Sequence, residues 1–135
     1  MAKTLSKKAQ ELIGRPVIAH VATVDTDGRP QLTPVWIDFE DGDLVFNTAK
    51  GRVKTANLEK NPYVAISIVD PGDPYNVVVV RGSVEGTEDG ADAHIDSLAK
   101  KYLGVDTYPM RQPGEVRIKY RVNADNIVMQ SDDAA

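Results

Sequence analysis

The chain has 135 residues, of which 41% are hydrophobic, which is enough for one compact domain with a core and too few for two comfortable ones. It contains no cysteine, which excludes disulfides, thiolate metal sites and thiol nucleophiles, and its only histidines, His20 and His94, are too isolated in sequence for a histidine metal centre. The net charge of −4, with the basic residues localised, disfavours a nucleic-acid-binding surface.

The first half of the chain predicts one helix followed by strands. Apolar residues at helical spacing over residues 5–13, followed by Gly14 and Pro16, predict a short amphipathic helix. Runs rich in β-branched residues, separated by turns that contain glycine, then predict an antiparallel meander of three strands: Val17 to Val24, Gln31 to Phe39 and Leu44 to Asn47. Pro34 removes a ladder donor from the second of these strands, so we expect an edge or a bulge there.

The second half predicts two more helices and four more strands. A short helix over residues 53–58 ends at Asn61-Pro62, and a longer one over residues 90–103 ends at Gly104. The predicted strands are Tyr63 to Val69, Asn76 to Glu85, Val116 to Val122 and Ile127 to Gln130, with a loop over residues 70–74 between the first two.

The number of strands indicates the architecture. Six or seven short antiparallel strands are too many for one flat open sheet in a chain of this size. We therefore predict a mainly β fold with short helices that closes into a small barrel, as a single domain over residues 1–130. Residues 131–135 are expected to form a frayed tail.

The same sequence carries no signal for a membrane or for export. Its start, Met1 to Lys8, leads into no apolar signal core, and apolar runs such as residues 77–80 are far shorter than a membrane span. We therefore expect a cytoplasmic protein without membrane insertion.

The densest positive charge lies where a predicted strand turns into a helix. Lys50, Arg52 and Lys54 fall within five residues there, and Thr48 adds a hydroxyl donor. The first N–H groups of a helix are unpaired and its dipole favours negative charge, so this turn suits a small, highly anionic ligand. A solvated helix start with ordinary surface lysines is the alternative interpretation.

A series of short motifs runs through nearly the whole chain. In order, they are Ala22-Thr23-Val24, Asp27 to Gln31, Thr33-Pro34-Val35-Trp36, Asn47 to Lys54, Asn57-Leu58, Asn61-Pro62, Gly90 to Asp96, Lys101 to Gly104, Tyr108-Pro109 and Arg111 to Arg117. Their order and spacing resemble the flavin- and deazaflavin-dependent oxidoreductases of the pyridoxamine-phosphate-oxidase-like split-barrel superfamily. More narrowly, the chain resembles the branch that uses coenzyme F420.

The resemblance implies a homodimer of FMN-binding-type split β-barrels with two cofactor sites in the grooves between the subunits. By position, Arg52 and Lys54 match the cationic pair that holds the cofactor's phosphate, and Lys50 would contact either that phosphate or the acidic glutamate tail. The other implied cofactor-binding residues lie beside the phosphate or the ring system: Asn47, Thr48 and Ala49 at one strand end, Gln31, Thr33, Pro34, Val35 and Trp36 on a second strand, and Tyr75, Asn76 and Val77 on a third.

The implied function is transfer of a hydride from reduced F420 to an electron-poor organic acceptor of the quinone, tetrapyrrole or unsaturated carbonyl type. An FMN-dependent oxidase or reductase on the same barrel and a non-catalytic F420 carrier are the alternatives. The sequence identifies neither the acceptor nor the preferred tail length, and it does not fix the direction of reaction. No residue is assigned as catalytic, because several proton donors are conceivable: Tyr63, Tyr75, Tyr102, Tyr108, His20, His94 and water.

Several conspicuous residues also have a purely structural interpretation. We expect His20 to be a hydrogen-bonded barrel residue, and His94 and Asp96 to face solvent or the partner subunit. Trp36 fits either a cover over the cofactor ring or a place in the core or interface. Tyr75 has two possible roles: it stacks on the ring or caps its loop. Two roles are also possible for Arg111, Glu115 and Arg117, which reach the partner's groove or form surface ion pairs.

Overall fold

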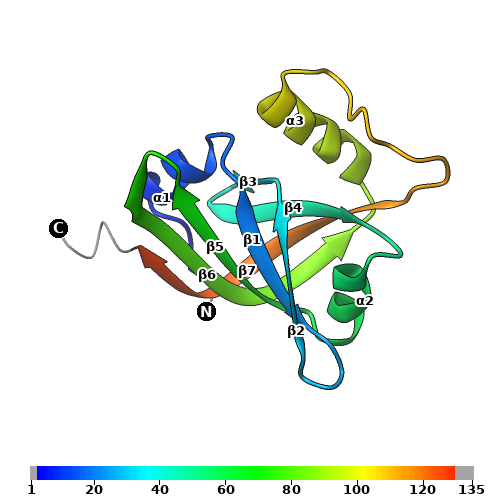
Figure 1. The fold of residues 1–135 in the computed structure, drawn as a ribbon, viewed down its shortest axis with the longest axis horizontal. Coiled ribbons are helices and arrows are strands. Elements are labelled where there is room, and N and C mark those ends of the chain that lie inside the picture. Colours follow the sequence, from blue (N-terminus) through cyan, green and yellow to red (C-terminus); the bar gives the residue numbers. More distant parts are fainter. Residues whose placement is uncertain (1–2, 130–135) are drawn as a thin grey trace.

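One antiparallel sheet curls on itself to form the body of the protein, and short helices lie at its margins (Figure 1). The computed structural model describes residues 3–129, and within them the sheet has seven strands and is accompanied by three helices. In chain order the elements are α1 (Lys7–Ile13), β1 (Ala19–Val24), β2 (Pro30–Val35), β3 (Ile37–Glu40), β4 (Asp43–Ala49), α2 (Val53–Lys60), β5 (Tyr63–Asp70), β6 (Asp73–Thr87), α3 (Ala91–Leu103) and β7 (Arg117–Met129).

The strand order explains why the barrel is split. The order is β2-β1-β5-β6-β7-β4-β3, so the two edge strands, β2 and β3, are neighbours in the sequence and are separated by Trp36 alone. Because no ladder joins these edges, the curled sheet stays open where the chain passes from one to the other. This arrangement confirms the predicted mainly β split barrel, and Pro34 lies on an edge strand as expected.

Two strand predictions were wrong. The stretch expected as one strand, Gln31 to Phe39, is two strands, because β2 pairs with β1 whereas β3 pairs with β4. The two strands expected at the C-terminal end form the single strand β7. Asp125 is an extra residue in this strand, a bulge that lies opposite Arg81 and Gly82 of β6. A Cβ at Gly82 would lie 2.2 Å from the carbonyl oxygen of Asn123, so only glycine allows the backbones to approach this closely.

The loop predicted over residues 70–74 is shorter than expected. It is a two-residue turn between β5 and β6, in which the Asp70 carboxylate accepts a hydrogen bond from the backbone N–H of Gly72 at 2.8 Å. The N-terminal helix lies within the predicted residues, and the helices predicted over 53–58 and 90–103 are confirmed as α2 and α3. The tail predicted over residues 131–135 lies outside the described residues.

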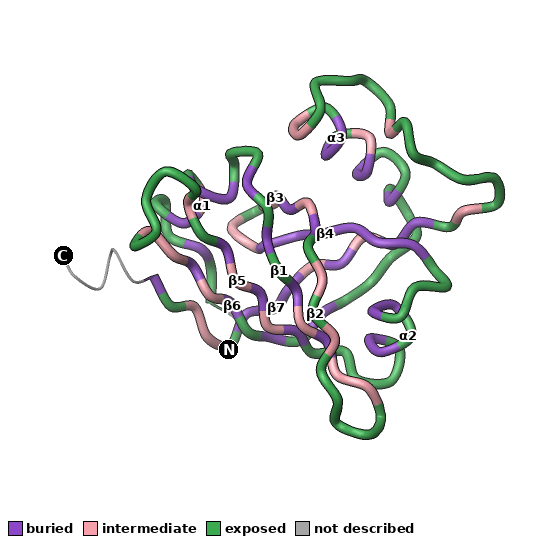
Figure 2. The backbone as a smooth tube through the Cα atoms, viewed as in Figure 1, coloured by how far each residue is buried: buried purple, intermediate pink, exposed green. Residues whose placement is uncertain are grey.

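Apolar side chains fill the interior of the curled sheet. Alternate residues of β5 point inward, and Phe46 of β4 is fully buried against them in the same core. Figure 2 shows the buried residues concentrated along the strands and on parts of α2 and α3. Since the interior is packed, a ligand has to bind where the barrel is split or on its outside. None of the helices formed by residues 3–129 is long and apolar enough to cross a membrane.

Buried and partly buried hydrogen bonds attach α2 and α3 to the rest of the fold near the split. Asn57 of α2 donates to the hydroxyl of Thr23 on β1 at 3.0 Å. The Tyr102 hydroxyl of α3 donates to the carbonyl of Val17 at 2.6 Å and accepts the N–H of Ile37 at 3.0 Å. Both helices are therefore fixed relative to the two sides of the opening.

Candidate functional site

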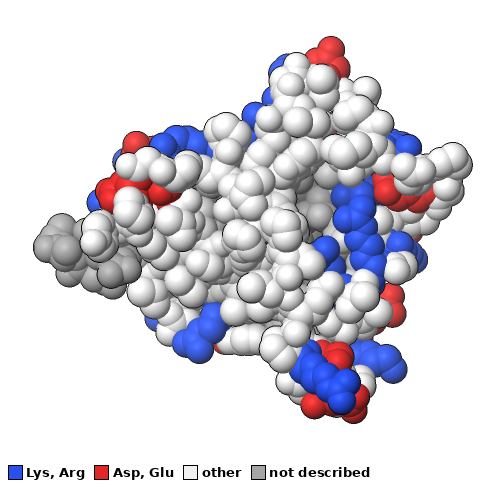
Figure 3. All heavy atoms as spheres, in the orientation of Figure 1, with Lys and Arg blue, Asp and Glu red and all other residues white. Residues whose placement is uncertain are grey.

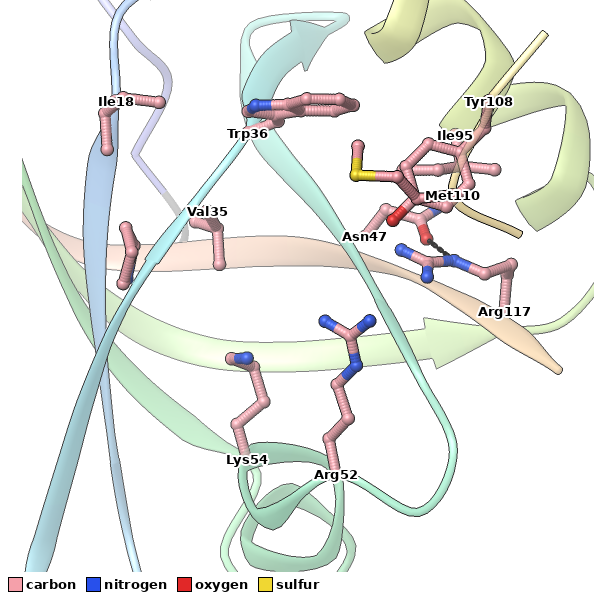
Figure 4. A pocket seen from close by; sticks show the side chains of 11 residues that line it. Ile18, Val35, Trp36, Asn47, Arg52, Lys54, Ile95, Tyr108, Met110 and Arg117 are labelled. Carbon is pink, nitrogen blue, oxygen red and sulfur yellow. Dashed lines mark hydrogen bonds between the residues drawn. The ribbon is translucent and has the colours of Figure 1, made fainter. Parts of the chain in front are cut away.

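A pocket of about 280 Å³ lies where the barrel is split (Figure 4). Its walls come from the edge strand β2, from β4 and β7 on the other side of the opening, from the first turn of α2, and from α3 with the segment that follows it. The lining residues are Ile18, Pro34, Val35, Trp36, Asn47, Arg52, Lys54, Ile95, Tyr108, Met110 and Arg117.

The first turn of α2 supplies two of the pocket's cations. Arg52 is the N-cap residue of the helix, Lys54 lies in its first turn, and both side chains extend into the pocket (Figure 4). Lys54 is only 6% exposed, yet it forms no hydrogen bond or ion pair with any residue between 3 and 129. Burial, together with the charges of Arg52 and Arg117, lowers the pKa of Lys54. A buried cation without a carboxylate is costly, so the site suits an anionic ligand.

Arg117 of β7 is the third cation, and its orientation is fixed by its neighbours. Its Nε donates to the side-chain oxygen of Asn47 at 2.8 Å, and its guanidinium carbon lies 5.1 Å from the centre of the Tyr108 ring. Burial lowers the pKa of Arg117, an effect that the nearby Glu115 carboxylate opposes. Only 4% of Arg117 is exposed, so this guanidinium is held rigidly beside the pocket.

The opposite wall of the pocket is aromatic and apolar. Trp36 stacks on Tyr102 with ring centroids 5.1 Å apart, and Tyr108 meets it edge-on at 5.9 Å. Ile18 and Met110 are about half exposed, at 46% and 50%, and extend the apolar surface. One side of the pocket can therefore contact a flat ring while the other contacts an anion.

Six of the predicted cofactor-binding residues line this pocket: Pro34, Val35, Trp36, Asn47, Arg52 and Lys54. Gln31 and Thr33 lie on the same strand as Pro34, and Thr48 and Ala49 follow Asn47 on β4, but none of these four lines the pocket. The hydroxyl oxygens of Thr33 and Thr48 are buried and have no hydrogen-bond partner among the described residues.

The remaining four predicted residues lie elsewhere. Lys50 is half exposed and forms an ion pair with Glu88 at 2.7 Å. Tyr75, Asn76 and Val77 belong to the start of β6, at the hairpin with β5, and do not line the pocket of their own subunit.

Sequence reasoning missed several pocket residues. Ile18 and Met110 lie outside the motifs, and Ile95 lies within the motif Gly90 to Asp96 but was given no role in the site. Arg117 was considered only for a partner's groove or a surface ion pair, whereas it is buried in the pocket of its own subunit. Arg111, by contrast, does form surface ion pairs with Asp92 and Asp96.

The expectation for His94 was wrong, and the expectation for His20 was correct only in part. His94 is 7% exposed, and its Nδ1 lies 3.0 Å from the side-chain nitrogen of Asn47, so it does not face solvent. His94 follows the buried Ala91 by three residues and precedes the buried Leu98 by four, so all three lie on one face of the helix. This spacing could have predicted that His94 is buried. His20 lies on the barrel strand β1, as expected, but its side chain is exposed and forms no hydrogen bond within residues 3–129.

Comparison with known proteins adds a second line of evidence. The family model described as pyridoxamine 5'-phosphate oxidase matches residues 5–124. The pyridoxine/pyridoxamine 5'-phosphate oxidases of two Bacteroides fragilis strains are 27% identical over 122 residues, which cover 88% of this chain and 45% of theirs. This chain therefore spans less than half the length of these curated relatives.

Two solved structures are similar in fold. A structure named F420 reductase is 32% identical and superposes with a TM-score of 0.76, over 88% of this chain and 94% of that one. A conserved hypothetical protein from Mycobacterium tuberculosis is 21% identical with a TM-score of 0.75, over 96% and 86% of the two chains. The second likeness shows the fold alone.

Proposed function

The chain belongs to the pyridoxamine 5'-phosphate oxidase family, and we propose that it is an F420-dependent reductase. In this proposal the pocket at the split holds coenzyme F420, and the reaction transfers a hydride to an electron-poor organic acceptor such as a quinone, a tetrapyrrole or an unsaturated carbonyl compound. The relative named F420 reductase, at 32% identity over most of both chains, supports this choice of cofactor.

The observation that carries the proposal is the convergence of three cations on a pocket with an aromatic wall. Arg52 and Lys54 have no carboxylate partner among residues 3–129, so a ligand with a phosphate group would balance their charge. The donor set therefore fits the phosphodiester of F420. Figure 3 shows cationic side chains along one side of a hollow on a face that is otherwise largely uncharged.

The aromatic wall gives the ring of the cofactor a defined place. Trp36 is held flat against Tyr102, and Met110 and Ile18 present apolar surface near it, so a planar ring bound here would lose contact with water on one side. The reduced deazaflavin, when bound, supplies the hydride. The chain's own residues bind its phosphate, orient its ring and exclude water, and we assign no proton donor among them.

FMN is the second candidate cofactor. It also joins a flat ring to a phosphate, and the curated relatives at 27% identity are named pyridoxine/pyridoxamine 5'-phosphate oxidases. The three cations would serve its phosphate in the same way. An FMN-dependent oxidase or reductase is therefore the alternative to the F420-dependent enzyme.

We further propose that the active form is a homodimer in which a second copy covers the open side of the pocket. Support comes from the uncharged centre of the face in Figure 3 and from apolar residues such as Leu32 on β2, which is 65% exposed. The start of β6, with Tyr75, Asn76 and Val77, does not reach the pocket of its own subunit, so its implied role would have to be played in the pocket of the other copy. The cytoplasmic location stays a prediction from the sequence.

Turnover tests the proposed reaction. Purified protein is mixed with reduced F420 or, in parallel, with reduced FMN, and oxidation of the cofactor is followed by absorbance with a quinone, a tetrapyrrole or an unsaturated lactone as acceptor. The proposal expects acceptor-dependent oxidation with reduced F420 only. Turnover with FMN only would establish the alternative, and tight F420 binding without turnover of any acceptor would indicate a carrier.

A further inference from the structure

We infer that Arg117 is a third anion-binding group of this pocket and that His94, as a hydrogen-bond acceptor, sets the orientation of Arg117 through the side-chain amide of Asn47. The inference rests on the proposed function only for the identity of the ligand. The chain of contacts runs from α3 through β4 to β7, outside the basic turn that the sequence singled out.

Arg117 has hydrogen-bonding capacity that the protein does not use. Its Nε is bonded to Asn47, but its Nη1 is buried and has no hydrogen-bond partner in the described part of the chain. The nearest carboxylate, Glu115, lies 3.4 Å from this nitrogen without hydrogen-bond geometry. A guanidinium stays charged and is costly to bury with unused donors. Nη1 faces Glu115, but the other terminal nitrogen, Nη2, forms no hydrogen bond or ion pair within residues 3–129 and is not one of the buried nitrogens. Since Arg117 lines the pocket, an anion bound there can accept a hydrogen bond from Nη2.

Asn47 fixes the direction of the Arg117 side chain. Its side-chain nitrogen donates to the carbonyl of Ala91 at 2.9 Å and also contacts Nδ1 of His94 at 3.0 Å. Both hydrogens of the amide nitrogen are used in this way, so the amide oxygen faces the Nε of Arg117. If the amide turned over, its N–H₂ group would face another donor and the bond to Arg117 would be lost.

His94 keeps the amide in this orientation only while its Nδ1 accepts a hydrogen bond. Nδ1 must then be unprotonated, and the neutral ring carries its hydrogen on Nε2. Burial lowers the pKa of His94 to about 4, and Lys119 and Arg117 on β7 act in the same direction, whereas Glu40 and Asp38 on β3 oppose them. The imidazole is therefore neutral at physiological pH.

A purely structural role accounts poorly for this histidine. Nε2 of His94 is buried and has no hydrogen-bond partner among residues 3–129. An orphaned donor destabilises the fold, and a leucine or methionine would fill the same space on α3 without that cost. The one polar contact that His94 does make through its ring, at Nδ1, is the contact that orients Asn47.

The experiment compares His94→Leu, which removes the acceptor, with His94→Asn, whose side-chain oxygen can occupy the place of Nδ1 and accept the same hydrogen bond. The first readout uses ligand-free protein labelled with ¹⁵N. The imidazole shifts of the wild type report the tautomer, and the Nε–H signal that disappears in Arg117→Lys identifies the bond to Asn47. The second readout is affinity for inorganic phosphate, for FMN and for F420.

We expect the wild-type ring to be protonated on Nε2 only. His94→Leu should lose the protected Arg117 Nε–H signal and weaken phosphate binding about tenfold, the scale of one charge-assisted hydrogen bond. His94→Asn should restore both readouts. A proton on Nδ1 of the wild type, or a His94→Leu variant that keeps both the signal and the affinity, would overturn the inference. If His94→Leu does not fold, the tautomer measurement and the Arg117→Lys affinity still decide it.

Different binding results bear on the cofactor and on Arg117. Wild-type protein that binds phosphate but neither F420 nor FMN would remove the cofactor assignment and leave the relay from His94 to Arg117 intact. If the wild type, Arg117→Lys and Arg117→Ala all bind F420 with the same affinity, Arg117 is not part of the anion site, and the cofactor assignment is unaffected.

Discussion

Trp36 lies flat on Tyr102, with the two rings inclined by 10° and their centroids 5.1 Å apart. The Tyr102 hydroxyl is itself held between the carbonyl of Val17 and the N–H of Ile37, the residue that follows Trp36. Burial raises the pKa of Tyr102 to about 12, so the hydroxyl keeps its proton and donates. The aromatic wall of the pocket is thus fixed by a contact between α3 and the point where the chain passes from β2 to β3.

Tyr102→Phe tests this fixation. The variant keeps the stacked ring but loses the hydroxyl, and we expect the free energy of unfolding to fall by about 1–2 kcal/mol because two buried backbone groups lose their partner. Urea denaturation followed by tryptophan fluorescence is a suitable measurement, since Trp36 is the sole tryptophan. The matched control is Tyr63→Phe, whose hydroxyl bonds the exposed Asp125. Equal stability losses in the two variants would contradict the prediction.

The basic first turn of α2 should dominate binding of the phosphate. Arg52→Ala and Lys54→Ala should each weaken F420 affinity by about tenfold or more, because each removes a cation that has no other partner within residues 3–129. Lys60→Ala, at the exposed opposite end of the same helix, is the control and should bind normally. Fluorescence titration gives the affinities. Losses of equal size in all three variants would show a general charge effect instead of a site.

Lys54 should destabilise the ligand-free protein. Its folded-state pKa lies below the unfolded value of 10.5, so the unfolded chain holds the proton more tightly and the cost of the buried charge is present in full below the folded pKa. We expect Lys54→Met to be more stable than the wild type by about 1 kcal/mol at pH 7. The gap should close as pH rises toward 10.5. Chemical denaturation at pH 7 and pH 10 measures this difference in stability, with Lys60→Met as the control. Equal stability of Lys54→Met and the wild type at pH 7 would contradict the prediction and indicate that an anionic group balances the charge of Lys54.

His94 should make the protein sensitive to acid. Its folded-state pKa of about 4 lies below the unfolded value of 6.5, so the unfolded chain takes up a proton first as pH falls. The stability it contributes is complete above pH 6.5 and is lost between pH 6.5 and pH 4, by up to about 3 kcal/mol. His94→Asn should lose less stability than the wild type over this interval. His20→Asn, at an exposed position, is the control, and identical acid profiles for all three proteins would refute the prediction.

Local sequence patterns predicted the parts of the site that lie close together in the chain. The basic turn was predictable because Arg52 and Lys54 follow one another across the start of a single helix. Arg117 was not, because its environment is created by the pairing of β7 with β4, in which it lies opposite Ala49. Its contact with Asn47 joins residues 70 positions apart.

The break at Trp36 was hidden for a related reason. Residues 31–39 form one strand pattern in which Pro34 indicates an edge or a bulge, and nothing in that pattern shows that the strand changes partner from β1 to β4. Helical phase, in contrast, could have placed His94 inside, because it shares a face with Ala91 and Leu98.

Parallel titration of the wild-type protein with F420 and with FMN, at low and high salt, shows which cofactor the pocket binds. We expect selective binding of F420 that weakens as salt is added, because cations at the pocket hold its phosphate. Selective binding of FMN would contradict the choice of cofactor, and binding of neither would contradict the assignment of this pocket as a cofactor site.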